Sequence, residues 1–493
     1  MRCGVTYQGS VRFSCLSFIL PLLLVAPAGA AELTMPDFSF AGYERGEQPI
    51  PRLQPDLSVR DFGAVGDGKT DDTAAFRKAL TTGAGKVIHV PAGRYLIKDI
   101  LSITTSRTVL QGEGSNRTIL VMPVPLEAIR PNPGRTTTGK ATSKYSWSGG
   151  LLRISGKGIT SPTDARLAPG AKRGEKSATL AKPGNFKPGD EVVIGWADGK
   201  DGALLNFLYA GDPGPDSKAV GRRKVHQVLR VVTINDQRIT FDRALFCDLD
   251  EHFNFTLSHF TPSLTHSGIE NLGFLFPEDP YRGHFTEVGH NPIELDNAVH
   301  CWVRNVHIHN ADSGIFISGG SFNTVENTRF TATRNPDKSG YTGHHGIQLS
   351  GSDHLVQRFS IENRFIHDIT VSSTQGAVVK DGLGSDLSLD GHKMGAFQNL
   401  FANLNCGKAN DLYRSGGGAD LGRHMGRATV FWNLTGENGP GLPKSDYGPP
   451  EMLFLGIGRG SPPKNEKWIA KPLPTNASDP HASALAERLR ASR

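Results

Sequence analysis

The sequence predicts an all-β fold, a solenoid of the parallel β-helix type, on two observations. Glycine is abundant, with 58 of 493 residues, and aromatic residues make up only 8%, which is typical of many short strands joined by tight turns. Asparagines that follow short strand-like runs recur along the second half of the chain, at Asn271, Asn305, Asn327, Asn363, Asn399 and Asn433. The intervals between them are 34, 22, 36, 36 and 34 residues. The shortest interval fits one bare coil of the β-helix, and the longer ones fit the same coil with an added loop.

The recurring asparagine has a physical reason. At the corner of a coil its side-chain amide can bond the equivalent amide of the next coil, and asparagine tolerates the left-handed backbone that such corners require. We therefore predict that these asparagines form one ladder. Substitution of Asn363 or Asn399 is then expected to destabilise the fold, because it leaves neighbouring amides unpaired.

The N-terminus has the pattern of a signal peptide. Arg2 and Arg12 precede an apolar run over residues 13–26, and Ala28-Gly29-Ala30 is a small-residue cleavage site. The run is too short for a comfortable membrane span, and no later segment is a candidate to cross a membrane. We expect cleavage after Ala30 and a secreted or periplasmic product.

The net charge indicates which partners the protein can have, and the cysteine count indicates the state of its thiols. The formal net charge is +6, which suits a polyanionic ligand, and no basic run is interleaved with aromatics, so nucleic acid is not expected. Cys247, Cys301 and Cys406 follow the signal peptide; their odd number and their spacing predict buried free thiols. We expect a monomer that does not associate with membranes.

The chain divides into six predicted segments: a signal peptide (1–30), an N-terminal strap (31–56), the start of the β-helix with a cap (57–120), an antiparallel β insertion (121–260), the main β-helix (261–435) and a C-terminal tail (436–493). A helix capped by Thr70 or Asp71 would close the open end of the solenoid. Alternation around the turn at Asn235-Asp236 predicts the antiparallel insertion. Its part over 200–222 is expected to be a loop that reaches toward the groove, and the tail ends in a short amphipathic helix.

A stretch at the start of the β-helix carries a family resemblance. The runs D-F-G-A-V-G-D-G-K-T-D-D-T-A-A-F (61–76) and V-I-H-V-P-A-G-R-Y-L-I (87–97) resemble the beginning of proteins of the pectate lyase and rhamnogalacturonase superfamily. The resemblance implies a right-handed parallel β-helix and a polysaccharide as partner. It does not choose the reaction, because lyases, hydrolases, epimerases and phage tailspikes share this stretch.

The resemblance also implies that one outer face of the helix is the substrate groove. Residues 314–318, 346–350, 376–380 and 411–415 align as successive rungs of one sheet. With a period of two, the outward side chains on these rungs are Phe316, Gln348, Lys380 and Tyr413. We predict that Phe316, Gln348 and Tyr413, together with Lys393, contact the substrate.

The densest polar cluster lies next to this predicted face, with His345 and Arg414 contributed by neighbouring coils. The candidate catalytic residues are Lys380, His392, Asp386, Asp390, Arg414 and His345. β-Elimination from a uronic acid needs a cation to neutralise the carboxylate and a base to remove the adjacent proton. Arg414, Lys393 or a histidine would serve as the cation, and Lys380 or His392 as the base.

Alternatives stay open at this point. Glycoside hydrolysis needs two carboxyls, which Asp386 with Asp390 or Asp353 would supply, and a non-catalytic glycan-binding β-helix is a third function. Aspartate pairs are the candidates for Ca²⁺, but no loop has EF-hand spacing, so no cofactor is assigned. His367 is interpreted as a packing histidine. A different location for the groove would centre on His284, Glu287 and His290. The sequence does not name the sugar or the linkage.

Overall fold

The computed structural model describes residues 35–136, 138–158, 166–182, 184–199, 201–218, 224–457, 467–473 and 477–491. The predicted signal peptide lies outside these residues. The chain forms two units, Met1–Met35 and Pro36–Arg493, and the second unit contains every element described below.

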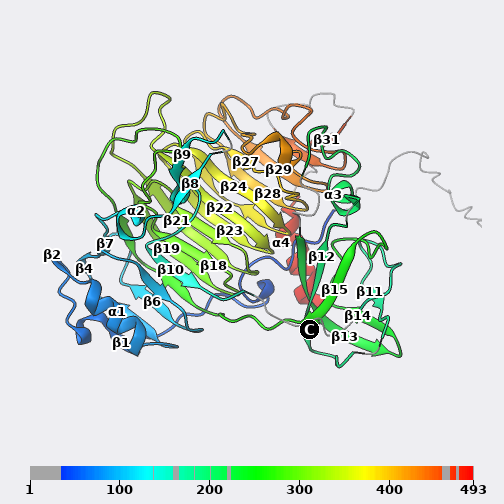
Figure 1. The fold of residues 1–493 in the computed structure, drawn as a ribbon, viewed down its shortest axis with the longest axis horizontal. Coiled ribbons are helices and arrows are strands. Elements are labelled where there is room, and N and C mark those ends of the chain that lie inside the picture. Colours follow the sequence, from blue (N-terminus) through cyan, green and yellow to red (C-terminus); the bar gives the residue numbers. More distant parts are fainter. Residues whose placement is uncertain are drawn as a thin grey trace, which may run out of the picture. The chain divides into compact units, whose positions relative to one another are not determined.

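The second unit is a parallel β-helix built on two large sheets (Figure 1). The first has seven parallel strands, in the order β5 (Leu101–Ile103), β10 (Leu152–Ser155), β18 (Ile293–Asp296), β20 (Ile315–Ser318), β22 (Gly343–Ser352), β24 (Phe365–Gln375) and β27 (Leu389–Gly391). This sheet is called the seven-stranded sheet below. The predicted right-handed parallel β-helix is confirmed.

The other sheet has seventeen strands. Its main parallel ladder runs through β1 (Leu57–Ser58), β3 (Val87–Val90), β6 (Val109–Gly112), β16 (Gly268–Glu270), β19 (Trp302–His309), β21 (Thr324–Thr331), β23 (Leu355–Ile361), β25 (Val378–Lys380), β28 (Leu400–Asn405), β29 (Val430–Thr435), β30 (Leu453–Ile457) and β31 (Ile469–Lys471). Further strands join its flank, namely β2 (Asp67–Asp71), β4 (Gly93–Leu96), β7 (Thr118–Val121), β17 (Gly273–Leu275) and β26 (Leu383–Gly384). The ladder therefore continues beyond residue 435, the predicted end of the helix.

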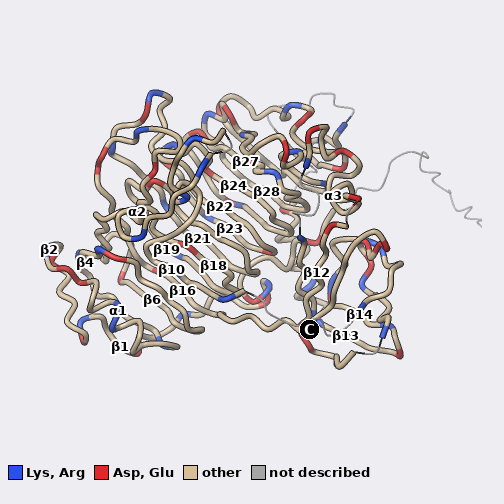
Figure 2. Tube along the Cα trace, in the orientation of Figure 1, with Lys and Arg blue, Asp and Glu red and all other residues tan. Residues whose placement is uncertain are grey.

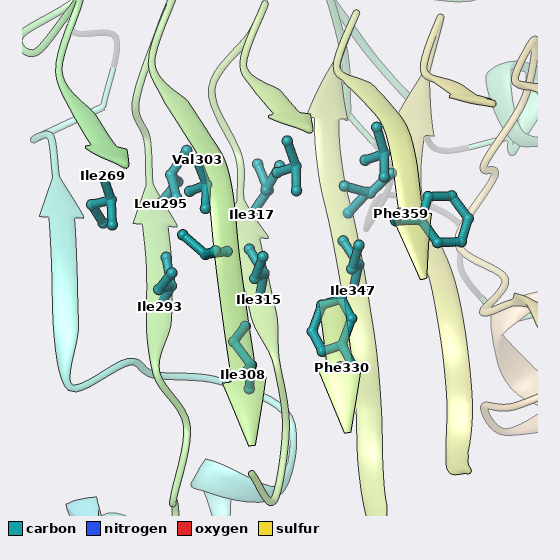
Figure 3. Close-up of a cluster of buried hydrophobic side chains, with 14 of the residues drawn as sticks. Ile269, Ile293, Leu295, Val303, Ile308, Ile315, Ile317, Phe330, Ile347 and Phe359 are labelled. Carbon is teal, nitrogen blue, oxygen red and sulfur yellow. The ribbon is translucent and has the colours of Figure 1, made fainter. Parts of the chain in front are cut away.

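The core lies between the two sheets (Figure 3). Ile293, Ile315 and Ile347 occupy the same register position on three neighbouring strands of the seven-stranded sheet, and all are fully buried. Val303 and Phe330 face them from the seventeen-stranded sheet. Burying an isoleucine or phenylalanine side chain contributes roughly 1.5–3 kcal/mol, so the repeated inward positions stabilise each coil against the next.

The predicted coil period is confirmed, and the asparagine ladder is correct in part. Asn305 Nδ2 donates to Asn271 Oδ1 at 2.9 Å, and Asn433 Nδ2 donates to Asn403 Oδ1 at 2.9 Å. Each of these asparagines has a left-handed φ, between 52° and 59°, at the corner where the strand bends. The placement of Asn363 and Asn399 in this ladder is wrong. The equivalent corner positions are held by Arg358, Asp381 and Asn403.

Asn399 belongs to a second, buried row at the opposite end of these strands. Its Oδ1 accepts from the backbone N of Ala377, 22 residues earlier, and its Nδ2 donates to the carbonyl of Thr374, both at 3.1 Å. Asn323 makes the equivalent bond to Cys301, also 22 residues earlier. One bare coil is therefore 22 residues long.

Asn399→Ala is expected to lower the free energy of unfolding by about 1–3 kcal/mol, because the buried backbone N of Ala377 loses its partner and the Thr374 carbonyl keeps only its bond from the backbone N of Phe397. Asn363→Ala is expected to cost less, about 0.5–1.5 kcal/mol, because Asn363 is half-buried and its Nδ2 donates to the Thr342 hydroxyl. Urea unfolding midpoints of the two variants measure the difference. Equal losses would mean that the buried row does not hold the coils.

The predicted antiparallel insertion is present as a five-stranded sheet. Its order is β11 (Ser177–Thr179), β14 (Arg238–Phe241), β13 (Lys224–Asn235), β12 (Glu191–Ala197) and β15 (Asn254–His259). Asp236, in the β13–β14 turn, has φ 53°, as expected of a tight hairpin. β10 lies in the seven-stranded sheet, so the five-stranded antiparallel sheet begins after Ser155 and not at residue 121. Before β10, β8 (Pro133–Arg135) and β9 (Ala141–Ser143) form a separate antiparallel hairpin.

The insertion packs on the flank of the helix. β13 contacts β22 and β24, and Gln375 Nε2 donates to the His226 carbonyl at 3.2 Å. The segment predicted as a loop toward the groove holds a short helix, α3 (Ala203–Leu208). Arg427 Nη1 donates to the carbonyl of Phe207 in α3 at 3.0 Å, which ties the insertion to the loop before β29.

The predicted N-terminal helix is α1 (Thr73–Thr82), which begins after Asp72 and not after Thr70 or Asp71. The Asp72 carboxylate instead accepts from the backbone N of Val65 and Gly66, which fixes the loop before the helix. Phe76 is buried in the core, and α1 contacts β5, the terminal strand of the seven-stranded sheet. That α1 closes the end of the solenoid stays a prediction.

The C-terminal helix α4 (Pro480–Ala491) packs against the N-terminal strap, where Arg488 Nη1 lies 2.8 Å from Glu47 Oε1.

Acidic and basic side chains are interspersed along the chain (Figure 2). Cys247, Cys301 and Cys406 are buried thiols, as predicted. In the part of the chain that the structure describes, no helix has the length and apolar character needed to cross a membrane.

Candidate active site

A pocket of about 440 Å³ lies beside the seven-stranded sheet and gathers five of the 17 histidines of the chain. Its lining residues are Arg135, Thr136, Trp147, His284, Phe285, His344, His345, His367, His392, Arg414, Ser415, Gly416 and Gly417. Among the described residues, five histidines and two arginines line it, and no aspartate or glutamate does. Hollows of similar size, about 470 and 570 Å³, lie beside α1 and on the insertion, with no histidine and one histidine respectively.

The parallel ladder brings the histidines together. His344 and His345 lie near the start of β22, and His367 lies near the start of β24, in register with His345. Adjacent strands are about 4.8 Å apart, so side chains at one register position meet. The rings of His345 and His367 stack at 5.0 Å, and those of His344 and His345 at 4.1 Å.

Asp390 on β27 organises one wall of the pocket. It is fully buried, and its Oδ2 lies 2.7 Å from His392 Nδ1 and 3.1 Å from His367 Nδ1. Its Oδ1 accepts from the backbone N of Gly416 at 2.7 Å. Burial alone would raise the pKa of Asp390, but the imidazoles of His367 and His392 outweigh it and hold that pKa well below its usual range. Asp390 is therefore a carboxylate that hydrogen-bonds the His392 ring and forms a close ion-pair contact with the His367 ring.

A second buried carboxylate, that of Glu287 in the loop between β17 and β18, lies behind His344 on the opposite wall of the pocket. Its Oε1 lies 3.4 Å from His344 Nδ1 and accepts from the Tyr281 hydroxyl. Burial raises the pKa of Glu287. Burial also lowers the pKa of His344 well below its usual value and that of His284 to about 4. Both rings are therefore neutral near pH 7.

The rim supplies cations and aromatic surface. Arg414 Nη1 bonds the Tyr341 hydroxyl and Asp411 Oδ2, each at 2.8 Å, and the guanidinium stays partly exposed. Trp147 packs edge-to-face on Phe285 at 5.9 Å. A guanidinium beside an aromatic rim matches the carboxylate and the ring face of an acidic sugar.

Of the six predicted catalytic residues, His345, His392 and Arg414 line this pocket, and Asp390 lies directly behind its histidines. Phe316 and Gln348 face outward on the seven-stranded sheet, in one register row with Thr370 and Asp390. Phe316 is only 1% exposed and packs near the His345 ring at 6.0 Å, so it supports the site from below and offers no surface to a substrate.

The predicted placement of Lys380 and Tyr413 is wrong. Ile347 pairs with Ile369, so β24 and then β27 continue the seven-stranded sheet, and the segments 376–380 and 411–415 do not. Lys380 lies on β25 of the other sheet, where its Nζ is 2.8 Å from Asp479 Oδ2. The Tyr413 ring packs in the core, 5.4 Å from Phe431. The error arose because apolar–polar alternation looks the same in both sheets.

Asp386 and Lys393 hold the loops around the pocket and do not line it. Asp386 accepts from the backbone N of Asn410 at 2.9 Å and pairs with Arg364 at 3.2 Å. Lys393 Nζ donates to the Gly418 carbonyl at 2.9 Å, next to the lining glycines. The carboxyl pair that the hydrolase alternative requires is therefore not assembled by Asp386 and Asp390.

Sequence reasoning missed Arg135 and Trp147 as site residues, placed His344 in the polar cluster beside the groove without assigning it a role, and interpreted His367 as a packing residue. A signal for the histidines was present, because His345 and His367 lie one bare coil apart in the ladder. Of the alternative location for the groove, His284 lines this pocket, whereas Glu287 lies behind His344 and lines a separate hollow together with His290. Nothing local marks Arg135 and Trp147. Arg135 ends β8 (Pro133–Arg135), which pairs with β9 (Ala141–Ser143) in a short antiparallel hairpin, and Trp147 follows that hairpin.

Comparisons with known proteins agree with this fold. Residues 57–123 match the family model described as rhamnogalacturonase A/epimerase, pectate lyase-like. Over 65 residues the chain is 46% identical to the phage-related protein YobO of Bacillus subtilis (strain 168), covering 13% of this chain and 8% of that protein. Over 182 residues it is 27% identical to the mannuronan C5-epimerase AlgE3 of Azotobacter vinelandii, covering 32% of this chain and 10% of that protein.

Among solved structures, the tailspike protein gp49 from Pseudomonas phage LKA1 aligns with a TM-score of 0.51 at 14% identity, over 77% of this chain and 59% of that one. The chain spans a tenth or less of the length of the two curated relatives, and the tailspike likeness concerns the fold alone. The chain is therefore a right-handed parallel β-helix protein whose first coils, residues 57–123, match the model of the rhamnogalacturonase A/epimerase, pectate lyase-like family.

Proposed function

We propose that this protein is a secreted polysaccharide lyase that cleaves a uronate-containing glycan by β-elimination. One observation carries the proposal: the pocket presents five imidazoles and two guanidiniums, and no carboxylate side chain among the described residues lines it. Such a surface attracts the carboxylate of an acidic sugar and offers neutral imidazole as a base. The signal-peptide pattern over residues 1–30 supports action outside the cytoplasm.

His392 is the base in this proposal. Its Nδ1 donates to Asp390, so its Nε2 carries the lone pair that takes the proton from C5 of the uronate. Asp390 then stabilises the imidazolium, as the buried aspartate does in a serine-protease triad. Arg414 and Arg135 bind the sugar carboxylate, which stabilises the negative charge that develops beside C5.

The bond changes balance without a further reactant. The C5–H electron pair moves into the carboxylate-stabilised carbanion and then forms the C4–C5 double bond. The C4–O4 bond breaks, its electrons leave with O4, and O4 takes a proton from water. The products are one new reducing end and one unsaturated uronate.

Hydrolysis fits this pocket less well. It needs two carboxyls about 5–9.5 Å apart that reach the glycosidic bond from both sides. Asp390 and Glu287 are 0% and 3% exposed and lie behind histidines. A C5 epimerase is the second candidate, because histidines from both walls line the pocket and would allow a proton to leave one face of C5 and return to the other. The 27% identity over 182 residues to mannuronan C5-epimerase AlgE3 favours the same alternative.

The test is a panel of acidic and neutral glycans, with three readouts on each. We expect ultraviolet absorbance of unsaturated uronate and new reducing ends in equal molar amounts, on acidic glycans only. Reducing ends without that absorbance would indicate a hydrolase. Deuterium uptake at C5 from heavy water without cleavage would indicate an epimerase. Affinity without any product would indicate a glycan-binding protein.

A further inference from the structure

We propose that the inner wall of this pocket binds a divalent transition-metal ion of the zinc class through His284, His344 and His367. One ring nitrogen from each of these residues can be chosen so that all lie within 4.8 Å of one another. His344 and His367 are 2% and 5% exposed, whereas His284 is exposed on the loop between β17 and β18. The three residues come from two adjacent strands and one loop, so they converge only in the folded chain.

A second observation points to a metal. Behind each buried imidazole stands a buried carboxylate on the Nδ1 side: Glu287 Oε1 is 3.4 Å from His344, and Asp390 Oδ2 is 3.1 Å from His367. Neither contact has the geometry of a hydrogen bond, so the Nδ1 atoms of His344 and His367 are buried without a hydrogen-bond partner. A carboxylate beside the imidazole accompanies most metal-binding histidines in proteins. Both carboxylates are themselves held, by the Tyr281 hydroxyl and by the backbone N of Gly416.

The donor set favours zinc over calcium. Three imidazoles with a fourth position open are typical of catalytic Zn²⁺ sites, whereas Ca²⁺ takes six to eight oxygen ligands. Nitrogens that share one tetrahedral zinc at about 2.1 Å lie about 3.4 Å apart. The separation of up to 4.8 Å therefore closes by a small inward movement of a side chain, and His284 is the ligand with the freedom to make it.

The inference goes beyond the proposed lyase chemistry and does not depend on it. The fourth position of such a site would face the pocket, where an oxygen of the sugar carboxylate could occupy it. Metal binding is nevertheless measured without any glycan, so failure of one proposal leaves the other standing.

The test uses full-length protein without a histidine tag, stripped with a chelator and dialysed. Calorimetric titration with Zn²⁺ is expected to give one equivalent bound per chain, and titration with Co²⁺ is expected to give the visible spectrum of a tetrahedral site. His344→Ala is expected to weaken Zn²⁺ binding more than 100-fold. Glu287→Gln is expected to weaken it by about 10- to 100-fold, the usual effect of losing the group behind a ligand.

The matched control is His307→Ala, on β19 of the other sheet, which is expected to bind Zn²⁺ as the wild type does. Circular dichroism and thermal melts check that each variant is folded. Wild-type protein that binds no stoichiometric Zn²⁺ would overturn the inference, as would equal affinity in folded His344→Ala and His307→Ala. Glycan cleavage, assayed separately, then decides the proposed function.

Discussion

His392→Ala is expected to lower turnover on a uronate-containing glycan by about 10²- to 10⁴-fold, the usual contribution of a general base. Asp390→Asn is expected to have an effect of similar size. The asparagine amide cannot stabilise the imidazolium as the carboxylate does, and it can hold the ring in the wrong tautomer. The measurement is the initial rate of unsaturated-uronate formation at saturating glycan, with circular dichroism to confirm the fold.

Lys380→Met tests whether the reaction takes place in the histidine-lined pocket or at the Lys380 site that the sequence suggests. Lys380 lies in the seventeen-stranded sheet and pairs with Asp479 at 2.8 Å, so turnover is expected to stay within about twofold of wild type, as for a substitution away from the reacting groups. Asp386→Asn is expected to behave alike, because Asp386 bonds Asn410 and Arg364. Loss of activity in Lys380→Met with normal activity in His392→Ala would refute the assignment.

Arg243→Ala is expected to lower the free energy of unfolding by about 3–5 kcal/mol, the usual cost of leaving one member of a buried ion pair alone. Arg243 Nη2 lies 3.0 Å from Asp353 Oδ1, and both side chains are at most 2% exposed. Arg243 follows β14 in the insertion and Asp353 follows β22 in the helix, so this pair joins the two. The guanidinium also stacks on Phe40 at 4.4 Å and on Phe246 at 4.6 Å, so truncation also removes packing.

Two controls define the cause of that loss. The double variant Arg243→Met with Asp353→Leu is expected to recover most of the stability, because no buried charge is left unpaired. Arg329→Ala removes an exposed pair with Glu362, at 55% and 43% exposure, and is expected to cost less than about 1 kcal/mol. Denaturant midpoints compare all three. A loss in Arg243→Ala no larger than that in Arg329→Ala would show that this pair does not hold the insertion.

The sequence by itself determined the architecture, because the architecture rests on local and periodic signals. The bare coil is 22 residues long, and bonds between residues 22 apart join one coil to the next. The corner of each coil needs a residue with left-handed backbone, which asparagine provides. The helix α1 and the β13–β14 hairpin likewise follow from short-range patterns, namely the apolar face of the helix and the alternation of the strands. These signals predict the elements without knowledge of the tertiary structure, since each signal depends only on near neighbours in the sequence.

Only the tertiary structure decided which residues form the site. Alternation tells whether a side chain faces inward or outward, but it does not tell which sheet a strand joins, so Lys380 and Tyr413 were assigned to a face that they do not share. His344, His367 and Asp390 meet because β22, β24 and β27 are neighbours, while His284 arrives from a loop of a different coil. Loop lengths vary from coil to coil, so the sequence alone does not show which strands of successive coils lie side by side. Contacts between coils depend on that alignment and not on the sequence near any one residue.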